Sequence, residues 1–130
     1  MIVYFITQKD FGISTILKPI IPESSPEYEG IIPRICVSTS ILGALSSIGN
    51  NLYLDCNTYI YKCDLDESEI IQPGKTVNDV DMTGELWILI EKEFILHKII
   101  KLRKVQSFCI DKEKETDIFN FEFDIVKIYK

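Results

Sequence analysis

Three hydroxyl side chains stand together at the joint between a predicted strand and a predicted helix. Ser38, Thr39 and Ser40 follow the predicted strand 34–37 and precede the predicted helix 41–48. Hydroxyl oxygens and open backbone N–H groups at the start of a helix suit a polar or anionic ligand. The same hydroxyls also cap helices that bind nothing. The triplet is therefore a candidate ligand site with a purely structural alternative.

Two charged residues outside the triplet are candidates for the same site. Arg34 keeps its charge at every relevant pH and can form a fork onto a phosphate, although a surface ion pair with Glu27 or Glu29 would use it equally well. Glu85 opens the predicted strand 85–90 and is suited to bind a ribose hydroxyl or to assist catalysis. The alternative for Glu85 is an exposed carboxylate at a strand start.

The elements around the triplet are readable from local patterns. Pro33 favours an extended chain before it, and the alternation over 34–37 predicts a short strand. The segment Ile41–Ile48 has apolar residues at helical spacing, and Gly49 supplies a helix end. We therefore expect a strand, a turn and then a helix over Ile41–Ile48.

The remainder of the chain carries mostly strand patterns. Alternating or β-branched segments predict strands at 2–7, 52–54, 59–63, 69–72, 85–90, 94–104, 107–110 and 118–129. A helix is the alternative for 94–104, but its β-branched content and lack of caps favour a strand. The sum is a β-dominated α+β fold of seven or eight strands with one helix, in a single domain over residues 1–130.

Two polar regions interrupt these elements. Residues 10–30 predict a long loop, of which the Pro-rich part 19–33 is either a lid or a surface excursion. A cluster of four carboxylates lies at Asp64, Asp66, Glu67 and Glu69. Its spacing lacks the glycine-centred pattern of calcium loops, so a solvated turn is favoured and no metal site is expected.

Composition limits the partners. The net charge of −6 argues against general affinity for double-stranded nucleic acid or an anionic membrane. We expect a cytoplasmic protein, since no leader pattern or spanning apolar run is visible, and a homo-oligomer stays open. The four cysteines lack metal or redox spacing and are expected to be reduced and mostly buried. His97, the one histidine, is expected at the edge of a core.

The segments VYFIT, PRICVSTS and TGELW together resemble the ADP-ribosyltransferase-like superfamily. The resemblance implies a split sheet, with Ser38-Thr39-Ser40 as the hydroxyl motif and Glu85 as the strand glutamate. It places Tyr4 and Phe5 at the first-strand position, with Thr7 at the end of that strand. Phe5 stands where the superfamily has an arginine or histidine that grips the nucleotide, which favours binding over catalysis. The opening, with Leu17-Lys18-Pro19 and Pro-Arg-x-Cys, also resembles small firmicute and phage proteins.

The resemblance implies a nucleotide ligand rather than a covalently bound cofactor. We expect binding, including sequestration, of an NAD-type, ADP-ribose-type or cyclic signalling nucleotide, in the service of a phage or mobile element against host defence. The first alternative is an active ADP-ribosyl- or RNA 2′-phosphotransferase that uses Glu85. The second is an acidic inhibitor or immunity protein that contacts a protein partner through the face at 64–69 and the loop at 22–28.

Overall fold

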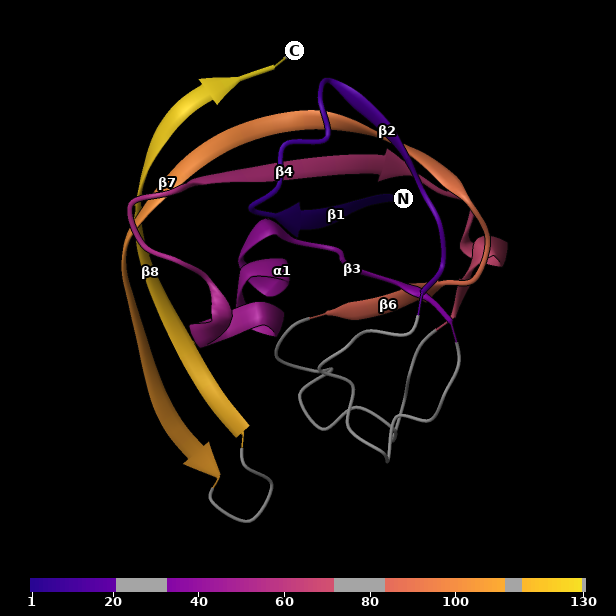
Figure 1. Ribbon diagram of the computed structural model, residues 1–130. Helices are drawn as coiled ribbons and strands as arrows, with labels where there is room; N and C mark the ends of the chain where they lie inside the picture. Colours follow the sequence, from indigo (N-terminus) through magenta and orange to yellow (C-terminus); the bar gives the residue numbers. More distant parts are fainter. Residues whose placement is uncertain (21–32, 72–83, 112–115, 130) are drawn as a thin grey trace.

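The computed structural model describes residues 1–20, 33–71, 84–111 and 116–129, and the structural statements below concern these residues. One α-helix and eight β-strands make up most of this part of the chain (Figure 1). The helix α1 spans Ile41–Ile48. The strands are β1 (Ile2–Thr7), β2 (Ser14–Leu17), β3 (Ile35–Ser38), β4 (Asn57–Asp64), β5 (Ile70–Ile71), β6 (Glu85–Ile88), β7 (Lys92–Asp111) and β8 (Thr116–Ile128). The expected β-dominated α+β character is confirmed.

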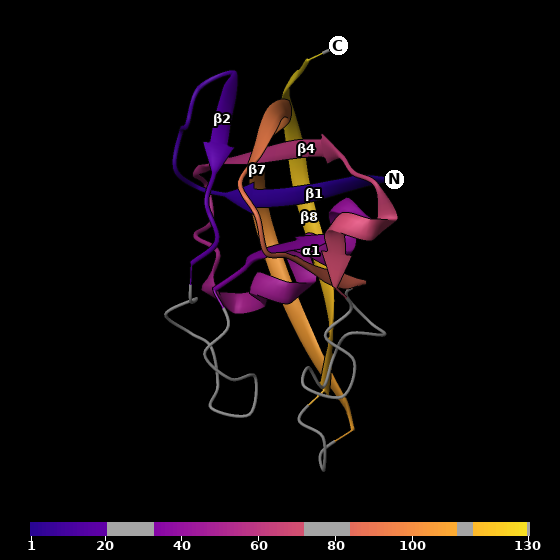
Figure 2. The ribbon, with the colours of Figure 1, turned by 90° about the vertical axis from the view of Figure 1, so that its right-hand side faces the viewer.

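The strands form one curled sheet with the order β2-β7-β4-β1-β3-β6-β5, and β8 pairs with β7. β1 is central, as its apolar sequence predicts. The long β7 pairs with β2 at its start, with β4 in its middle and with β8 along its second half. Figure 2 shows β7 and β8 continuing together past α1 as a ribbon. An isolated bridge between Ile20 and Arg34 brings the chain after β2 back to the start of β3.

The two faces of the sheet carry two separate apolar clusters. The first face is lined by buried residues of five strands, and Phe5 packs against them. This cluster contains Val3, Ile35, Val37, Tyr61, Cys63, Leu65, Leu86, Ile88, Phe94 and Leu96. The second face is covered by α1, and its cluster contains Ile6, Ala44, Leu45, Leu52, Ile60, Ile100 and Leu102. Tyr4 packs against this second cluster, so the alternation of β1 decides which side chains reach which face.

The helix begins and ends where its sequence predicts. The Oγ of Ser40 accepts the backbone N–H of Gly43 at 2.9 Å, which makes Ser40 the N-cap. Gly49 ends the helix with a positive φ of 59°. A methyl group at Gly49 would lie 2.7 Å from the ring of Phe119 on β8, so the helix end and the β7–β8 ribbon approach each other closely there.

Two sequence expectations about strands are wrong, and a third is right about the strands but wrong about a break between them. The predicted loop at 10–30 contains the strand β2, which the sequence does not indicate. Its four residues are too few to show a period, and its stability comes from pairing with β7. Residues 52–54 form no strand, because they follow a 3-10 turn at Gly49–Asn51 and lead into a turn in which Asp55 has a positive φ. The predicted strands 94–104 and 107–110 are parts of the single strand β7.

Two other predicted segments are only partly covered by the described residues or shorter than expected. The predicted strand at 69–72 is shorter, with only Ile70–Ile71 in β5 after a 3-10 turn at Glu67–Glu69. Most of the Pro-rich segment 19–33, including Glu27 and Glu29, lies outside the described residues. In the part of the chain that the structure describes, no helix has the length and apolar character needed to cross a bilayer.

Candidate functional site

The candidate site begins with a row of side chains across three neighbouring strands. The Cα partner of Ser38 on β3 is Glu85 on β6, and on the other side of β3 Ser38 pairs with Tyr4 of β1. Residues opposed in an antiparallel pair point to the same face. Val37, the neighbour of Ser38, belongs to the first cluster, so Ser38 faces the opposite side, where α1 lies. The fold thus brings together three residues that are far apart in sequence.

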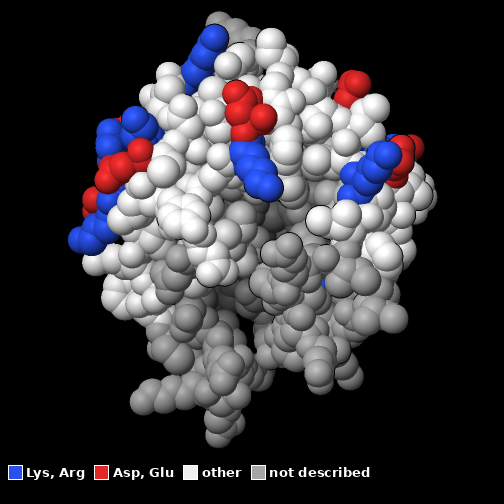
Figure 3. Space-filling model, in the orientation of Figure 1, with Lys and Arg blue, Asp and Glu red and all other residues white. Residues whose placement is uncertain are grey.

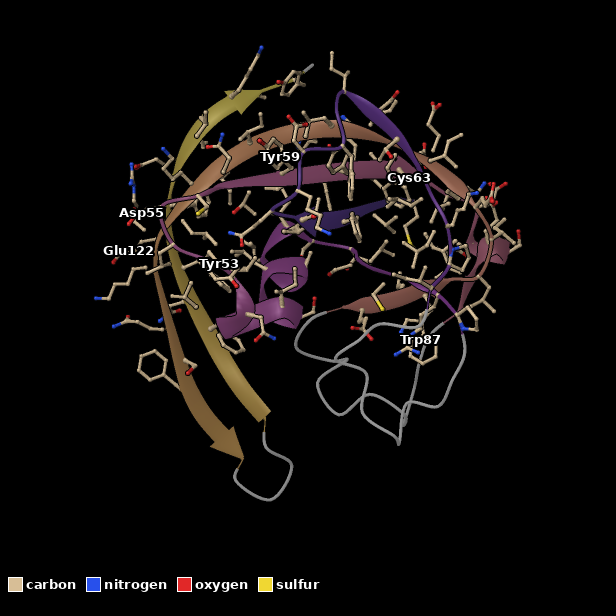
Figure 4. The ribbon with its side chains drawn as sticks, in the orientation of Figure 1. Tyr53, Asp55, Tyr59, Cys63, Trp87 and Glu122 are labelled. Atoms are coloured by element: carbon tan, nitrogen blue, oxygen red, sulfur yellow. The ribbon has the colours of Figure 1, made fainter. Side chains whose placement is uncertain are left out.

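Trp87 links this row to Arg34. The indole Nε1 of Trp87 donates a hydrogen bond of 3.0 Å to Oε2 of Glu85, two residues earlier on the same face of β6. The guanidinium carbon of Arg34 lies 4.1 Å from the centre of the Trp87 ring, which is a cation–π contact. Figure 4 shows Trp87 at β6, on the lower side of the sheet in that view. Glu85, Trp87 and Arg34 therefore form one connected unit.

Arg34 is buried rather than exposed. Its relative exposure is 2%, so the alternative of a surface position does not hold, and the suggested partners Glu27 and Glu29 lie outside the described residues. The reason is the bridge to Ile20 and the stacking on Trp87, two contacts between distant segments that no local pattern announces. In this arrangement the guanidinium orients Trp87, and Trp87 in turn orients the carboxylate of Glu85.

The three hydroxyls have different roles. Ser38 is 1% exposed, and its Oγ accepts the backbone N–H of Ser40 at 3.4 Å. Ser40 is the helix N-cap, so its hydroxyl has a structural role as the acceptor of the Gly43 N–H. Thr39 is exposed and lies against Gly84, where a methyl group would be 2.8 Å from its Oγ1. Gly84 has a φ of +63°, so it allows both the turn into β6 and this close approach.

Two of the predicted site residues lie elsewhere. Phe5 packs against the first cluster, with its ring centre 6.2 Å from that of Phe94, on the face opposite to Tyr4 and Ser38. The Oγ1 of Thr7 accepts the backbone N–H of Lys9 at 3.1 Å, which closes the end of β1. The structure therefore joins Tyr4, the hydroxyl triplet, Arg34 and Glu85, and it leaves Phe5 and Thr7 outside.

Carboxylates of the acidic cluster at Asp64, Asp66, Glu67 and Glu69 form structural contacts within the protein. Asp66 and Glu69 form a capping box on the 3-10 turn, and Glu69 forms an ion pair with Lys92. This pair lowers the pKa of Glu69 through its hydrogen bond from Lys92. Asp64 pairs with the N-terminal ammonium of Met1 at 3.0 Å. Within the described residues no group of acidic, histidine or cysteine side chains could hold a metal ion.

The expectation that the cysteines are mostly buried holds for one of the three whose side chains are described, since Cys36 is half-buried and Cys56 is exposed. Cys63 is buried, and burial raises the pKa of its thiol, whereas Cys56 is exposed. No disulfide links Cys36, Cys56 and Cys63. His97 lies on β7 at the edge of the second face, with its ring centre 5.9 Å from that of Tyr4.

Sequence reasoning missed two residues of this site. Trp87 was assigned only to a strand, yet its spacing of two residues from Glu85 puts both on one face of that strand, a signal that the sequence does contain. Gly84 was assigned only to the end of a polar connection. Its close approach to Thr39 depends on the pairing of β3 with β6, which the sequence alone does not reveal.

Charge on the face seen in Figure 3 occurs in small mixed groups separated by uncharged surface. At one such group Arg103 forms ion pairs of 2.7 Å with both Asp55 and Asp124. Among the described residues on that face, no basic patch of the kind that binds nucleic acid is seen. Comparisons with protein-family models, curated proteins and solved structures find no match for this chain.

Proposed function

We propose that this chain is a binding protein for a small ribose-containing nucleotide of the NAD or ADP-ribose type. The observation that supports it is the pairing of Ser38 with Glu85, beside Tyr4 and next to the exposed hydroxyl of Thr39. A carboxylate and hydroxyls at one spot can accept and donate the hydrogen bonds of a ribose. Trp87 and Arg34 hold the carboxylate in place, and a pre-oriented group loses less freedom on binding.

Binding is favoured over catalysis because of the first-strand position. The transferase-like pattern needs a cation there, but Phe5 is aromatic and packs on the opposite face. The transferase-like fold type is part of this proposal. The cellular role that we propose is sequestration of a signalling nucleotide, including a cyclic one, for a phage or mobile element.

Calorimetry with NAD, ADP-ribose and cyclic dinucleotides tests the proposal. We expect saturable binding of at least one of them, weakened about tenfold or more by Glu85→Gln, because hydrogen bonds to charged groups are worth about 1.5–3 kcal/mol. The amide oxygen of glutamine can still accept from Trp87, so this variant keeps the local structure. The matched control is Glu67→Gln, an exposed carboxylate on the 3-10 turn. Absence of binding by all ligands would refute the proposal.

An active transferase is the second candidate. The observation that favours it is the indole hydrogen bond that fixes the Glu85 carboxylate, since an oriented carboxylate can stabilise an oxocarbenium-like ribose. Release of nicotinamide from NAD by the wild-type protein, and its loss in Glu85→Gln, is the expected result for an enzyme. Turnover that is equal in both proteins would exclude Glu85 as the catalytic residue.

A further inference from the structure

The polar row does not stop at Tyr4 but continues onto β4. Tyr4 has two Cα partners, Ser38 on β3 and Lys62 on β4. The row is therefore Glu85, Ser38, Tyr4 and Lys62 over four neighbouring strands on the face that carries α1. Three strand spacings correspond to about 14 Å along the sheet. A carboxylate lies at one end of this row and an ammonium group at the other.

Lys62 lacks the carboxylate partner that a half-buried cation ordinarily has. Its side chain is partly buried, and among the described residues no carboxylate forms an ion pair with it. Other lysines of the described region, Lys18 and Lys92, do form such pairs. A partly desolvated charge without a counter-ion is costly, and an anionic ligand would remove that cost.

His97 adds a second unsatisfied group beside Lys62. His97 lies where β4 and β7 shift register, next to the ring of Tyr4. Its Nδ1 is buried and has no hydrogen-bond partner among the described residues. Buried polar atoms are ordinarily paired, so an atom of this kind indicates a place for a water or a ligand oxygen.

Two lysine ammonium groups act on His97 at this end of the row, although the protein is acidic. The pKa of His97 is lowered first by burial and then by the positive charges of Lys62 and Lys98. Two ammonium groups thus act on the same ring in a chain whose net charge is −6. Such a local positive field attracts an anion.

We infer that Lys62 and His97 form a phosphate-binding subsite at the β4 end of the row. The inference rests on the proposed function for the sugar end, where Glu85 and the exposed hydroxyl of Thr39 would meet ribose hydroxyls. The ligand then lies across β6, β3, β1 and β4 with its phosphate or pyrophosphate at Lys62. Its class is a ribose phosphate or nucleoside diphosphate, with the phenol of Tyr4 between the two ends.

Calorimetry at low salt with two probes, inorganic pyrophosphate and ADP-ribose, tests the subsite. We expect both to bind the wild-type protein and both to bind at least tenfold more weakly to Lys62→Met. Lys62→Arg keeps the charge and should retain binding within a few fold. The matched control is Lys101→Met, because Lys101 is also half-buried and carries the same charge, but it lies outside the row, with Asp124 of β8 as its Cα partner. Its affinity should stay within twofold of wild type.

The outcomes separate the subsite from the proposed function. Pyrophosphate binding that is lost in Lys62→Met, while NAD, ADP-ribose and cyclic dinucleotides all fail to bind, supports the subsite and refutes the nucleotide proposal. ADP-ribose binding that is weakened by Glu85→Gln but unchanged by Lys62→Met overturns the subsite and leaves the proposed function standing. No pyrophosphate binding by the wild-type protein also overturns the subsite. Circular dichroism of each variant checks that it is folded, and Lys62→Gln, which also removes the charge, provides the test if Lys62→Met does not fold.

Discussion

The guanidinium carbon of Arg34 lies 4.1 Å from the centre of the Trp87 ring, and the indole N–H of that ring holds Glu85. Both residues are almost fully buried, at 2% and 3% exposure. A cation and an aromatic ring that leave water together interact more strongly than an exposed pair. This contact fixes the β3–β6 side of the candidate site.

Substitution of Trp87 separates the two contacts. Trp87→Phe keeps a ring beneath Arg34 but removes the donor to Glu85, so we expect a loss of about 1–2 kcal/mol in the free energy of unfolding. Trp87→Leu also removes the ring face and should cost about 1 kcal/mol more. Urea unfolding measures the free energy of unfolding of both variants. Circular dichroism is the signal, because neither variant contains a tryptophan whose fluorescence could be followed. Equal stability of the two variants would mean that the ring does not hold Arg34.

Gly49 and Gly12 form a matched pair for testing the approach of the β7–β8 ribbon to α1. Both have positive φ, at 59° and 86°, but only Gly49 faces a neighbour, the Phe119 ring. Each substitution by alanine should cost at least about 1 kcal/mol through backbone strain, and more at Gly49, whose φ of 59° and ψ of −125° lie outside the left-handed helical region. Gly49→Ala should cost about 1–3 kcal/mol more, because its methyl group overlaps the ring.

Thermal or urea unfolding of the two alanine variants provides the comparison. A second substitution, Phe119→Leu, should restore part of the stability of Gly49→Ala because a smaller side chain gives way to the methyl group. Equal losses at Gly12 and Gly49 would show that the ribbon does not rest against the helix end.

Ser40 and Thr39 provide a test of which hydroxyl caps α1. Ser40→Ala removes the bond to the Gly43 N–H and should cost about 1 kcal/mol of stability. Thr39→Ala removes an exposed hydroxyl and should change stability by less than about 0.5 kcal/mol. Urea unfolding of both variants is the measurement. The reverse order would place the cap at Thr39.

The local parts of the fold could be predicted from the sequence, and the long-range parts could not. The limits of α1 follow from Ser40, Gly49 and the helical spacing between them, which are all short-range signals. The strand β2 could not be found, because its four residues are ordered by pairing with β7, some eighty residues away. The alternation of apolar and polar residues identifies a strand, but it does not indicate which other strand it pairs with.

The same limit applies to the candidate site. The resemblance placed Ser38 and Glu85 in one site, and the register of β3 with β6 makes them Cα partners. It placed Phe5 there too, although Tyr4 and Phe5 are neighbours on a strand and must face opposite sides. The burial of Arg34 could not be foreseen, because it depends on Ile20 and Trp87, which approach it only in the folded chain.

His97 should make stability depend on pH in a defined direction. Burial, followed by the charges of Lys62 and Lys98, lowers its pKa below the ordinary value of 6.5 that it regains on unfolding. The unfolded chain therefore binds more protons than the folded chain as the pH falls through 6.5. The free energy of unfolding should decrease with falling pH in this range, and the stabilising contribution is complete only above pH 6.5.

The prediction is tested by urea unfolding of the wild-type protein and His97→Gln between pH 7.5 and 5.5, where most carboxylates stay ionised. The variant should lose the part of the pH dependence that belongs to His97. The difference in free energy of unfolding between the wild-type protein and the variant should therefore narrow or change sign as the pH falls. NMR titration of the His97 ring provides a direct measurement, and Lys62→Met should raise the pKa because it removes one of the two positive charges. A pKa at or above 6.5 in the wild-type protein would contradict both the buried position of the ring and the positive field at this end of the row.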